Sequence, residues 1–199
     1  GDVGINSPER GGAVRCWQSD PSFEDCVFEN CEANFGGAVM AYAASPSFLR
    51  CEFVGNNAVA GGAVCNLAGL DMLITNCLFR GNRHAVAVEG AAKLSGCDFW
   101  ENTGSDPASC LYLWGSDSLV ENCTFVGNSH LVFNLCGNSG PVVRNSVIAF
   151  NLDSWSSCLG SPMFDRCVSY GNTNSEVLCG TIGEIMFTAP LLCELASFH

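Results

Sequence analysis

The sequence predicts an all-β fold, a single parallel β-helix (solenoid) of about seven or eight coils. A motif of about two dozen residues recurs along the chain, and apolar residues alternate with period two inside it. Gly, Asn or Pro interrupts the pattern every six to ten residues, which leaves no room for a two-turn helix. Short strands stacked coil on coil place equivalent residues about 4.8 Å apart, and this arrangement accounts for all three observations.

The repeat is clearest in CVFENCEANFGGAV at 26–39 and CEFVGNNAVAGGAV at 51–64. Shorter copies follow as LFRGN, DFWEN and TFVGN at 78–82, 98–102 and 124–128. Aligned on the first cysteine, the copies step by 25, 26, 20, 26, 23 and 21 residues. The anchor column reads Cys26, Cys51, Cys77, Cys97, Cys123, Ser146 and Cys167.

Two residues after each anchor is a second apolar column: Phe28, Phe53, Phe79, Phe99, Phe125, Ile148 and Ser169. Because successive strand residues face opposite sides, both columns should point inward and the residue between them outward. Five residues after the anchor stands an asparagine column, with Cys31 in the first copy: Asn56, Asn82, Asn102, Asn128, Asn151 and Asn172. We expect these asparagines at a tight turn with left-handed backbone angles, their amides hydrogen-bonded in a ladder.

The fourteen cysteines are expected to be mostly reduced thiols. Stacked residues have Cβ atoms about 4.8 Å apart, which is too far for a disulfide. A second set, expected on another inner face, comprises Cys65, Cys110, Cys136, Cys158 and Cys179. Cys16, Cys31 and Cys193 lie off the columns and are candidates for a disulfide or an end-cap contact. With no CxxC motif and only three histidines, no metal–thiolate site is predicted.

The repeats are expected over 11–180, after a lead-in or cap fragment at 1–10 and before a frayed last coil or C-terminal cap at 181–199. Paired glycines in GGAV at 11–14, 36–39 and 61–64 should bend the chain before a strand. The chain begins at Gly1 without Met or a leader, which favours a mature, trimmed or excerpted product. Open coil ends would expose strand edges, so we expect a cap, more protein beyond His199 or end-to-end homo-oligomeric assembly.

Composition excludes some partners. With 48% hydrophobic and 14% charged residues, the chain is not a disordered one. A net charge of −12 would repel the nucleic-acid backbone and anionic membrane surfaces. The sequence contains no run of about eighteen apolar residues, so no membrane insertion is expected.

The FxxN strings (53–56, 79–82, 99–102, 125–128) and the GGAV strings resemble repeats of chlamydial polymorphic outer-membrane autotransporter passengers. They are also similar to the right-handed β-helix proteins of the pectate-lyase-like superfamily. The resemblance covers about residues 11–180 and implies a right-handed coil and a secreted bacterial or cell-surface protein. Cys31, Ser146 and the loss of GGAV after residue 64 depart from the family pattern.

Enzymes of that superfamily mostly cleave acidic polysaccharides, but their NTD, DD, GHG, RIK, vWiDH and RxPxxR strings are absent here. The candidate catalytic residues are Arg80, Arg83 and His84 in FRGNRH, with Lys93 and Glu89 half a coil away. A solvated turn explains this group more simply than catalysis does. No cofactor is predicted, except Ca²⁺ if the protein is a lyase.

Candidate binding residues are the aromatic side chains Trp100 and Tyr170, in the outward column after the core Phe, and Trp114 and Trp155. The last two lie in or near the insertions Thr103–Ser109 and Leu152–Ser157. In another outward column, Glu121, Arg144 and Asp165 should be vertical neighbours that form a surface ion-pair row. Insertions on a solenoid often carry its binding residues, and aromatic rings stack on sugars.

The sequence therefore predicts a non-catalytic extracellular or cell-surface module, an adhesin or structural unit whose partners are glycans or surface proteins. Two alternatives remain open: a polysaccharide lyase or glycoside hydrolase of the β-helix type, and an extracellular fibre subunit that stacks through its coil ends.

Overall fold

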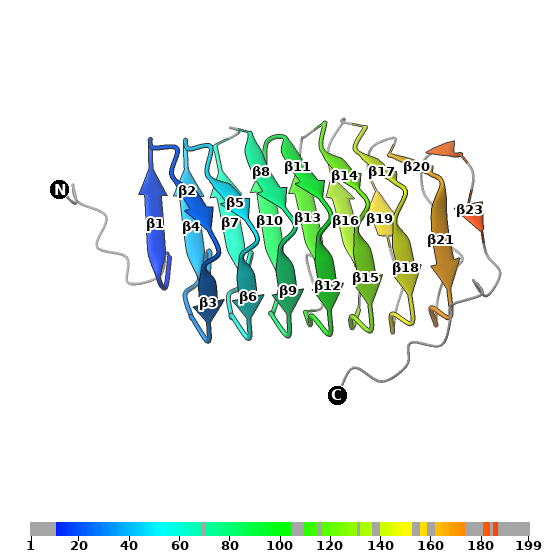
Figure 1. The fold of residues 1–199 in the computed structure, drawn as a ribbon, viewed down its shortest axis with the longest axis horizontal. Helices are drawn as coiled ribbons and strands as arrows, with labels where there is room; N and C mark the ends of the chain where they lie inside the picture. The colour runs from blue at the N-terminus through cyan, green and yellow to red at the C-terminus, as the bar shows by residue number, and fades with distance from the viewer. Residues whose placement is uncertain are drawn as a thin grey trace.

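The computed structural model describes residues 11–68, 71–104, 110–114, 117–130, 132–136, 140–152, 156–158, 162–173, 181–183 and 185–186. Over these ranges the chain is an all-β parallel solenoid (Figure 1). From β1 to β18, each strand pairs in parallel with the third strand after it in the sequence. Three sheets therefore run along the axis. This confirms the parallel β-helix predicted from the repeat.

The first sheet contains β1 (Val14–Trp17), β4 (Val39–Tyr42), β7 (Val64–Leu67), β10 (Val86–Glu89), β13 (Leu111–Trp114), β16 (Phe133–Cys136) and β19 (Ser156–Cys158). The second contains β2 (Ser22–Glu24), β5 (Ser47–Leu49), β8 (Met72–Thr75), β11 (Ala92–Ser95), β14 (Leu119–Glu121), β17 (Val142–Arg144), β20 (Met163–Asp165) and β22 (Thr181–Ile182). The third contains β3 (Val27–Glu29), β6 (Glu52–Val54), β9 (Leu78–Arg80), β12 (Asp98–Trp100), β15 (Thr124–Val126), β18 (Val147–Ala149), β21 (Cys167–Tyr170) and β23 (Ile185–Met186).

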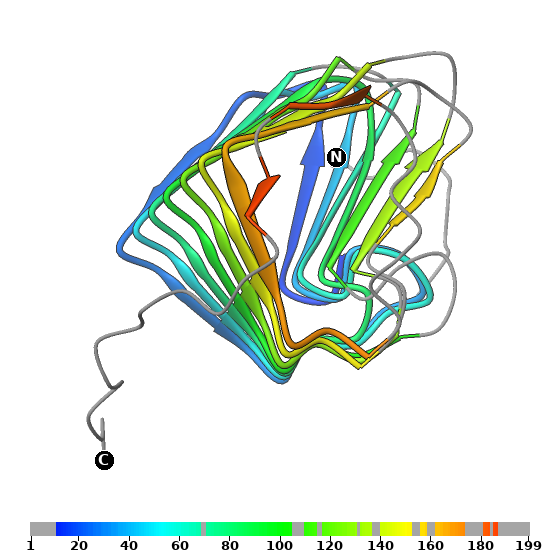
Figure 2. The same cartoon turned by 90° about the vertical axis from the view of Figure 1, so that its right-hand side faces the viewer.

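Viewed along the axis, the coils superpose and the three sheets enclose a narrow interior (Figure 2). About five turns, β1 to β15, are described with the side chains of every strand. The predicted lead-in 1–10 and most of 181–199 lie outside the described residues. Within the latter range, β22 and β23 pair with β20 and β21.

The interior of the third sheet is a stack of phenylalanine rings. Phe28, Phe53, Phe79, Phe99 and Phe125 are register partners in successive strands, and all are buried. Their neighbouring ring centroids are 4.6 to 4.9 Å apart, with interplanar angles of 3° to 13°. This distance is the strand spacing itself, so strand pairing and ring stacking reinforce each other.

At the corner after the third sheet, the buried asparagines form a continuous hydrogen-bonded ladder. Asn82 Nδ2 donates to Asn102 Oδ1 at 3.1 Å and to the Phe53 carbonyl oxygen at 2.8 Å. The Asn102 Oδ1 atom also accepts the backbone N–H of Asn82 at 3.0 Å. Each amide thus uses two donor and two acceptor positions, bridging the coils before and after it. The same contacts recur at Asn56, Asn128 and Asn151.

The left-handed backbone was expected at these asparagines, and that expectation is wrong by one residue. Positive φ falls on the preceding position, for example Gly55 (62°), Gly81 (63°) and Glu101 (52°). A second left-handed column precedes the anchor cysteines, as at Arg50 (51°) and Asn76 (51°). The turn is made one residue early because the asparagine must already point inward for its amide to reach both neighbouring coils.

The anchor cysteines occupy the corner between the second and third sheets and behave as hydrogen-bonding thiols. The backbone N–H of Cys51 donates to Cys77 Sγ at 3.4 Å, and that of Cys97 donates to Cys123 Sγ at 3.4 Å. In the next coil, Ser146 Oγ accepts from Cys123 N at 3.1 Å. Serine can replace cysteine there because a hydroxyl fills the same acceptor role. Free thiols are Cys16, Cys26, Cys31, Cys51, Cys77, Cys97, Cys123 and Cys167.

Two expectations about the other cysteines need correction. The second set does not share one face. By register, Cys65 and Cys136 stand in outward columns of the first sheet, aligned with Met40 and Trp114, whereas Cys158 aligns with Leu135 in the inward column. Cys110 lies in the main core, and Cys179 is outside the described residues. Unequal turn lengths put these cysteines at different places in the coil. Cys16 and Cys31 carry free thiols that pack on the core, and Cys193 lies outside the described residues.

Candidate functional site

The candidate catalytic residues are distributed over all three sides of the solenoid. Arg80 ends β9 in the third sheet, Glu89 ends β10 in the first, and Lys93 lies in β11 of the second. Arg83 is exposed in the turn between the third and first sheets, where it bridges Asn57 and Thr103. The structure therefore does not gather these side chains into one catalytic cluster.

His84 has a structural position in that turn. Its side chain is buried, and its backbone has a φ of 53°. The imidazole packs directly against Gly104, because a Cβ on Gly104 would lie 2.4 Å from Nδ1. Its backbone N–H donates to the Thr103 carbonyl oxygen at 2.8 Å. His84 thus closes the short turn rather than presenting its ring to solvent.

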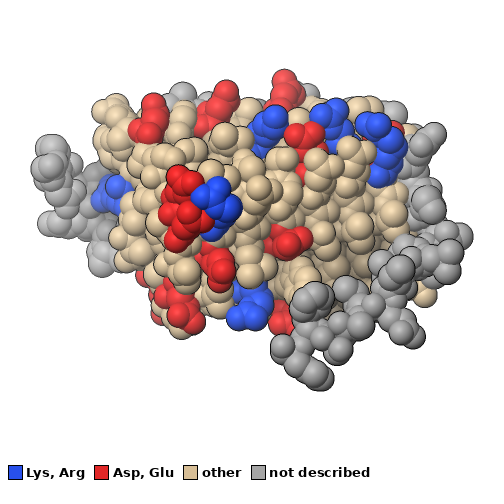
Figure 3. Space-filling model, in the orientation of Figure 1, with Lys and Arg blue, Asp and Glu red and all other residues tan. Residues whose placement is uncertain are grey.

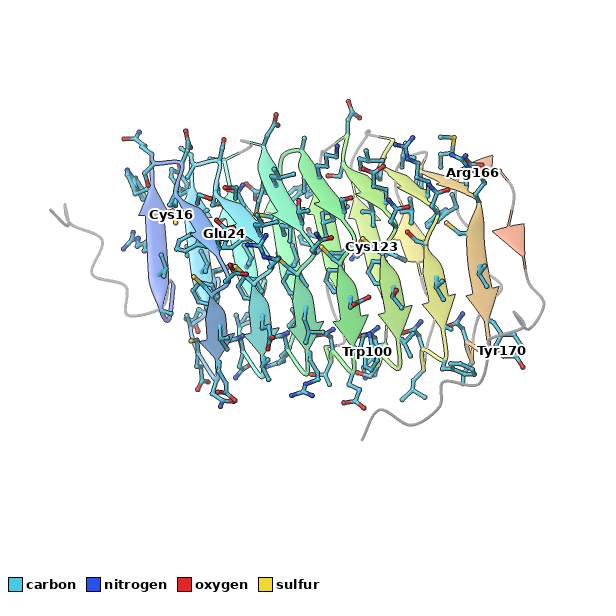
Figure 4. The ribbon with its side chains drawn as sticks, viewed as in Figure 1. Cys16, Glu24, Trp100, Cys123, Arg166 and Tyr170 are labelled. Carbon is cyan, nitrogen blue, oxygen red and sulfur yellow. The ribbon has the colours of Figure 1, made fainter. Side chains whose placement is uncertain are left out.

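Trp100 and Tyr170 belong to the outward column of the third sheet, which has the register predicted for it. They are separated along it by Val126 and Ala149, and both lie toward the lower edge of the molecule in Figure 4. Trp100 is exposed beside Arg80, while Tyr170 packs edge-on against Phe150 with ring centroids 5.5 Å apart. Trp155 lies outside the described residues. These candidates do not form a common aromatic platform.

Trp114 instead lies on the outward side of the first sheet, together with aromatic residues that sequence reasoning did not select. The first five strands of this sheet end in outward residues, and the register aligns Trp17 with Tyr42, Tyr42 with Leu67, and Glu89 with Trp114. The Trp17 and Tyr42 rings stack at 4.5 Å and 16°, and Arg15 lies 5.5 Å from the Trp17 ring. We call the set Trp17, Tyr42, Leu67, Glu89 and Trp114 the aromatic row. Alignment on the Val of GGAV would have found its first three members, each three residues further on.

A second apolar layer lies beside this row. Met40, Cys65 and Ala87 face outward yet are almost fully buried, because Phe35, Ala60 and Tyr112 pack against them. The GGAV turns make this cover possible: a Cβ on Gly36, where φ is 62°, would lie 2.7 Å from the Met40 Cα. The turn thus covers the beginning of each strand and leaves the strand end, with the aromatic row, accessible. Trp17 and Trp114 remain 42% and 51% exposed.

A hollow interrupts the corner between the first and second sheets. Only Gly90 and Ala91 connect β10 to β11, whereas four residues connect β4 to β5, β7 to β8 and β13 to β14. The short link belongs to the 20-residue repeat step, from Cys77 to Cys97. The resulting hollow of about 350 Å³ is lined by Ser45, Asp71, Met72, Leu73, Ala91, Ala92, Lys93, Asp117 and Leu119. Glu89 and Trp114 are register partners and end β10 and β13, the strands that precede the links with Ala91 and Asp117 of the lining.

The charged side chains of the hollow differ in whether they form ion pairs. Lys93 Nζ lies 3.7 Å from Glu121 Oε1, and Arg144 contacts the other oxygen of Glu121 at 2.7 Å. The hydrogen bond from Arg144 lowers the pKa of the Glu121 carboxyl. Asp117 accepts from the Gly140 N–H at 3.4 Å. Among the described residues, nothing forms an ion pair with Asp71 or Asp117.

The second sheet carries the predicted row of alternating charges. Glu121, Arg144 and Asp165 are register partners, as expected from the sequence, and basic and acidic side chains lie together over the right half of the upper edge in Figure 3. A separate group at β2 and β5 joins Arg50 to Glu24 and to Asp25, the latter at 2.8 Å. These exposed pairs hold charge on the surface and contribute little stability.

Four of the buried thiols, Cys51, Cys77, Cys97 and Cys167, are poorly suited to nucleophilic chemistry. Burial raises the pKa of Cys77 to about 12, and burial also raises the pKa of Cys51 and Cys167. The hydrogen bond with Cys123, together with burial, raises the pKa of Cys97. The reactive form is the thiolate, so these residues fill the core as small apolar groups at neutral pH.

No model of a known protein family, no curated protein and no solved structure matches this chain. Within the described part of the chain, no group of three or more His, Cys, Asp or Glu side chains could hold a metal ion. The same part contains no helix long and apolar enough to cross a membrane. The function must therefore be argued from the aromatic row and the hollow.

Proposed function

We propose that this protein is a non-catalytic, extracellular or cell-surface solenoid that binds glycans along the outward side of its first sheet. The observation that carries the proposal is the aromatic row, in which exposed Trp17 and Trp114 lie on one face with Tyr42 and Glu89. The C–H face of a sugar ring packs on an aromatic ring, and a nearby carboxylate accepts hydrogen bonds from sugar hydroxyls. An extended glycan can meet such groups along a line.

Rigidity supports this proposal. The row is attached to strands whose positions are fixed on both sides by parallel pairing, and its neighbours Met40 and Cys65 are buried beneath the GGAV turns. Binding groups held on strands lose little conformational entropy when a ligand arrives. A repeating scaffold also matches a repeating ligand, because successive members of the aromatic row are separated by one strand spacing.

The proposal includes a right-handed solenoid of seven to eight coils. Sheets of seven, eight and eight strands support that number of coils, and parallel crossover connections are right-handed in the great majority of proteins. The resemblance of the FxxN and GGAV strings to autotransporter passengers supports secretion or surface display. Labelling of intact cells with an antibody against the protein tests this location, and protection from the antibody until lysis would contradict it.

The enzyme and fibre alternatives have less support. A lyase or hydrolase needs its acid and base within reach of one bond, yet Arg80, Glu89 and Lys93 lie in three different sheets. Stacking through coil ends would require matching terminal strands. Release of unsaturated products or new reducing ends from polysaccharides would favour the enzyme, and concentration-dependent filaments in electron micrographs would favour the fibre.

The direct test is affinity electrophoresis against neutral and acidic polysaccharides. We expect retardation by at least one of them, and we expect Trp114→Ala to weaken it about tenfold, the effect of losing one stacking contact. Trp100→Ala is the matched control, because Trp100 is similarly exposed but lies on the third sheet. No retardation by any glycan, or an equal loss in both variants, would reject the first sheet as the binding face.

A further inference from the structure

The hollow, at the corner between the first and second sheets, has charged groups of its own. Asp71 and Asp117 line opposite sides of it, on links that belong to coils on either side of the short one. Their backbones are separated by two strand spacings, about 10 Å, so a ligand group fits between the two carboxylates. The lining also includes the apolar side chains of Leu73 and Leu119, which face outward from the second sheet.

The single cation of the lining does not offset these carboxylates. Lys93 Nζ lies 3.7 Å from Glu121, and its side chain is 55% exposed to solvent. Glu89 adds a further acidic group at the first-sheet side, where its Oε2 accepts the Ala68 N–H at 3.3 Å. The hollow is therefore net acidic, in a protein whose net charge is −12. An anionic sugar such as a uronic acid would be repelled here, and a cationic group attracted.

We propose that the hollow is a subsite for a protonated amino sugar, one unacetylated unit of a glycan bound along the aromatic row. This inference rests on the proposed glycan-binding function. An ammonium group has three N–H donors, and the carboxylates of Asp71 and Asp117 supply charged acceptors for them. The apolar side chains pack against the C–H face of the same sugar ring, while Trp114 stacks on a neighbouring unit. The hollow of about 350 Å³ falls within the range of pockets that enclose a small ligand.

The test compares three oligosaccharides of equal length by isothermal titration calorimetry: a glucosamine hexamer, an N-acetylglucosamine hexamer and cellohexaose. At a pH where the amine is protonated, we expect the glucosamine hexamer to bind about tenfold more tightly than the other two, because only it makes charge-assisted hydrogen bonds. This preference should decline with added salt, and as the pH rises through the amine pKa.

The variants Asp71→Asn and Asp117→Asn should each reduce the preference for the glucosamine hexamer over cellohexaose, because each removes one charged acceptor of the ammonium group. Asp98→Asn is the control, since it changes the net charge equally but lies in β12 of the third sheet, on an exposed outward position. If Asp98→Asn lowers glucosamine binding as much as Asp71→Asn does, general charge attraction explains the preference and the subsite is rejected.

The two proposals fail in distinguishable ways. Equal binding of all three hexamers would overturn the amino-sugar subsite and leave glycan binding in place. Absence of binding by all three, together with the polysaccharide panel, would overturn glycan binding itself. If an oligolysine peptide binds with the same dependence on Asp71 while no hexamer binds, the partner is a basic protein segment and the saccharide assignment is wrong.

Discussion

The third sheet repeats the same inward and corner residues from coil to coil, whereas the first sheet changes its outward residues and its turn lengths. In the third sheet, five phenylalanine rings stack 4.6 to 4.9 Å apart beside a ladder of asparagine amides. Along the aromatic row of the first sheet, tryptophan, tyrosine, leucine and glutamate occupy equivalent positions. A ladder residue must pack against or hydrogen-bond to its equivalents in both neighbouring coils, while an outward residue contacts only solvent or a ligand. The repeated residues of the third sheet thus stabilise the fold, whereas the varied outward residues of the first sheet are available for binding.

The largest effect should come from breaking the amide ladder. Asn102→Ala removes the acceptor of the Asn82 backbone N–H and of one Nδ2 N–H, while the other Nδ2 N–H keeps the Phe53 carbonyl oxygen. At about 1–3 kcal/mol for each of the two stranded N–H groups, we expect a loss of about 2–6 kcal/mol in the free energy of unfolding, measured by urea titration followed by circular dichroism. The exposed Asn34→Ala is the control and should be nearly neutral. Equal midpoints for the two variants would contradict a structural role of the ladder.

A comparison of adjacent residues on one strand gives the next effect. Phe99→Ala opens a cavity in the ring stack and should cost about 3–5 kcal/mol. Trp100→Ala, one residue further along β12, removes a side chain that is 45% exposed and should cost less than about 1 kcal/mol. Thermal unfolding of the two variants checks this. If the tryptophan variant proves the less stable one, the outward column of the third sheet contributes to folding in a way that burial does not indicate.

The smallest effect at neutral pH concerns the thiol column. Burial raises the pKa of Cys77 from 9.0 to about 12, so the folded protein holds this proton more tightly than the unfolded chain. The contribution to stability is complete below pH 9.0 and is lost as the pH rises toward 12. Cys77→Ser, which copies the hydroxyl of Ser146, should therefore reduce the alkaline decline of the urea midpoint. An unchanged decline in this variant would assign the pH dependence to other groups.

The sequence was sufficient to predict the parallel coil and the register of its second and third sheets, because those columns are defined by repeated cysteine, phenylalanine and asparagine. The unequal turns around the first sheet obscured the aromatic row. Trp17, Tyr42 and Trp114 each stand nine residues before the next anchor cysteine, but Leu67 stands ten residues and Glu89 eight residues before it. The same turns bring Glu89 and Lys93 to either side of one corner but separate them from Arg80.

The sequence by itself determined which residues stack. Similar residues that recur about every two dozen positions can all be buried only if successive coils place them one above another. It did not determine which outward residues become neighbours, because a turn two residues shorter than its equivalents changes the surface without changing the register of the core. The hollow between Asp71 and Asp117 arises only from that difference, over the link Gly90–Ala91. The core columns follow directly from the repeated residues. The hollow depends on the relative lengths of the turns in adjacent coils, and those turns become neighbours only in the folded structure.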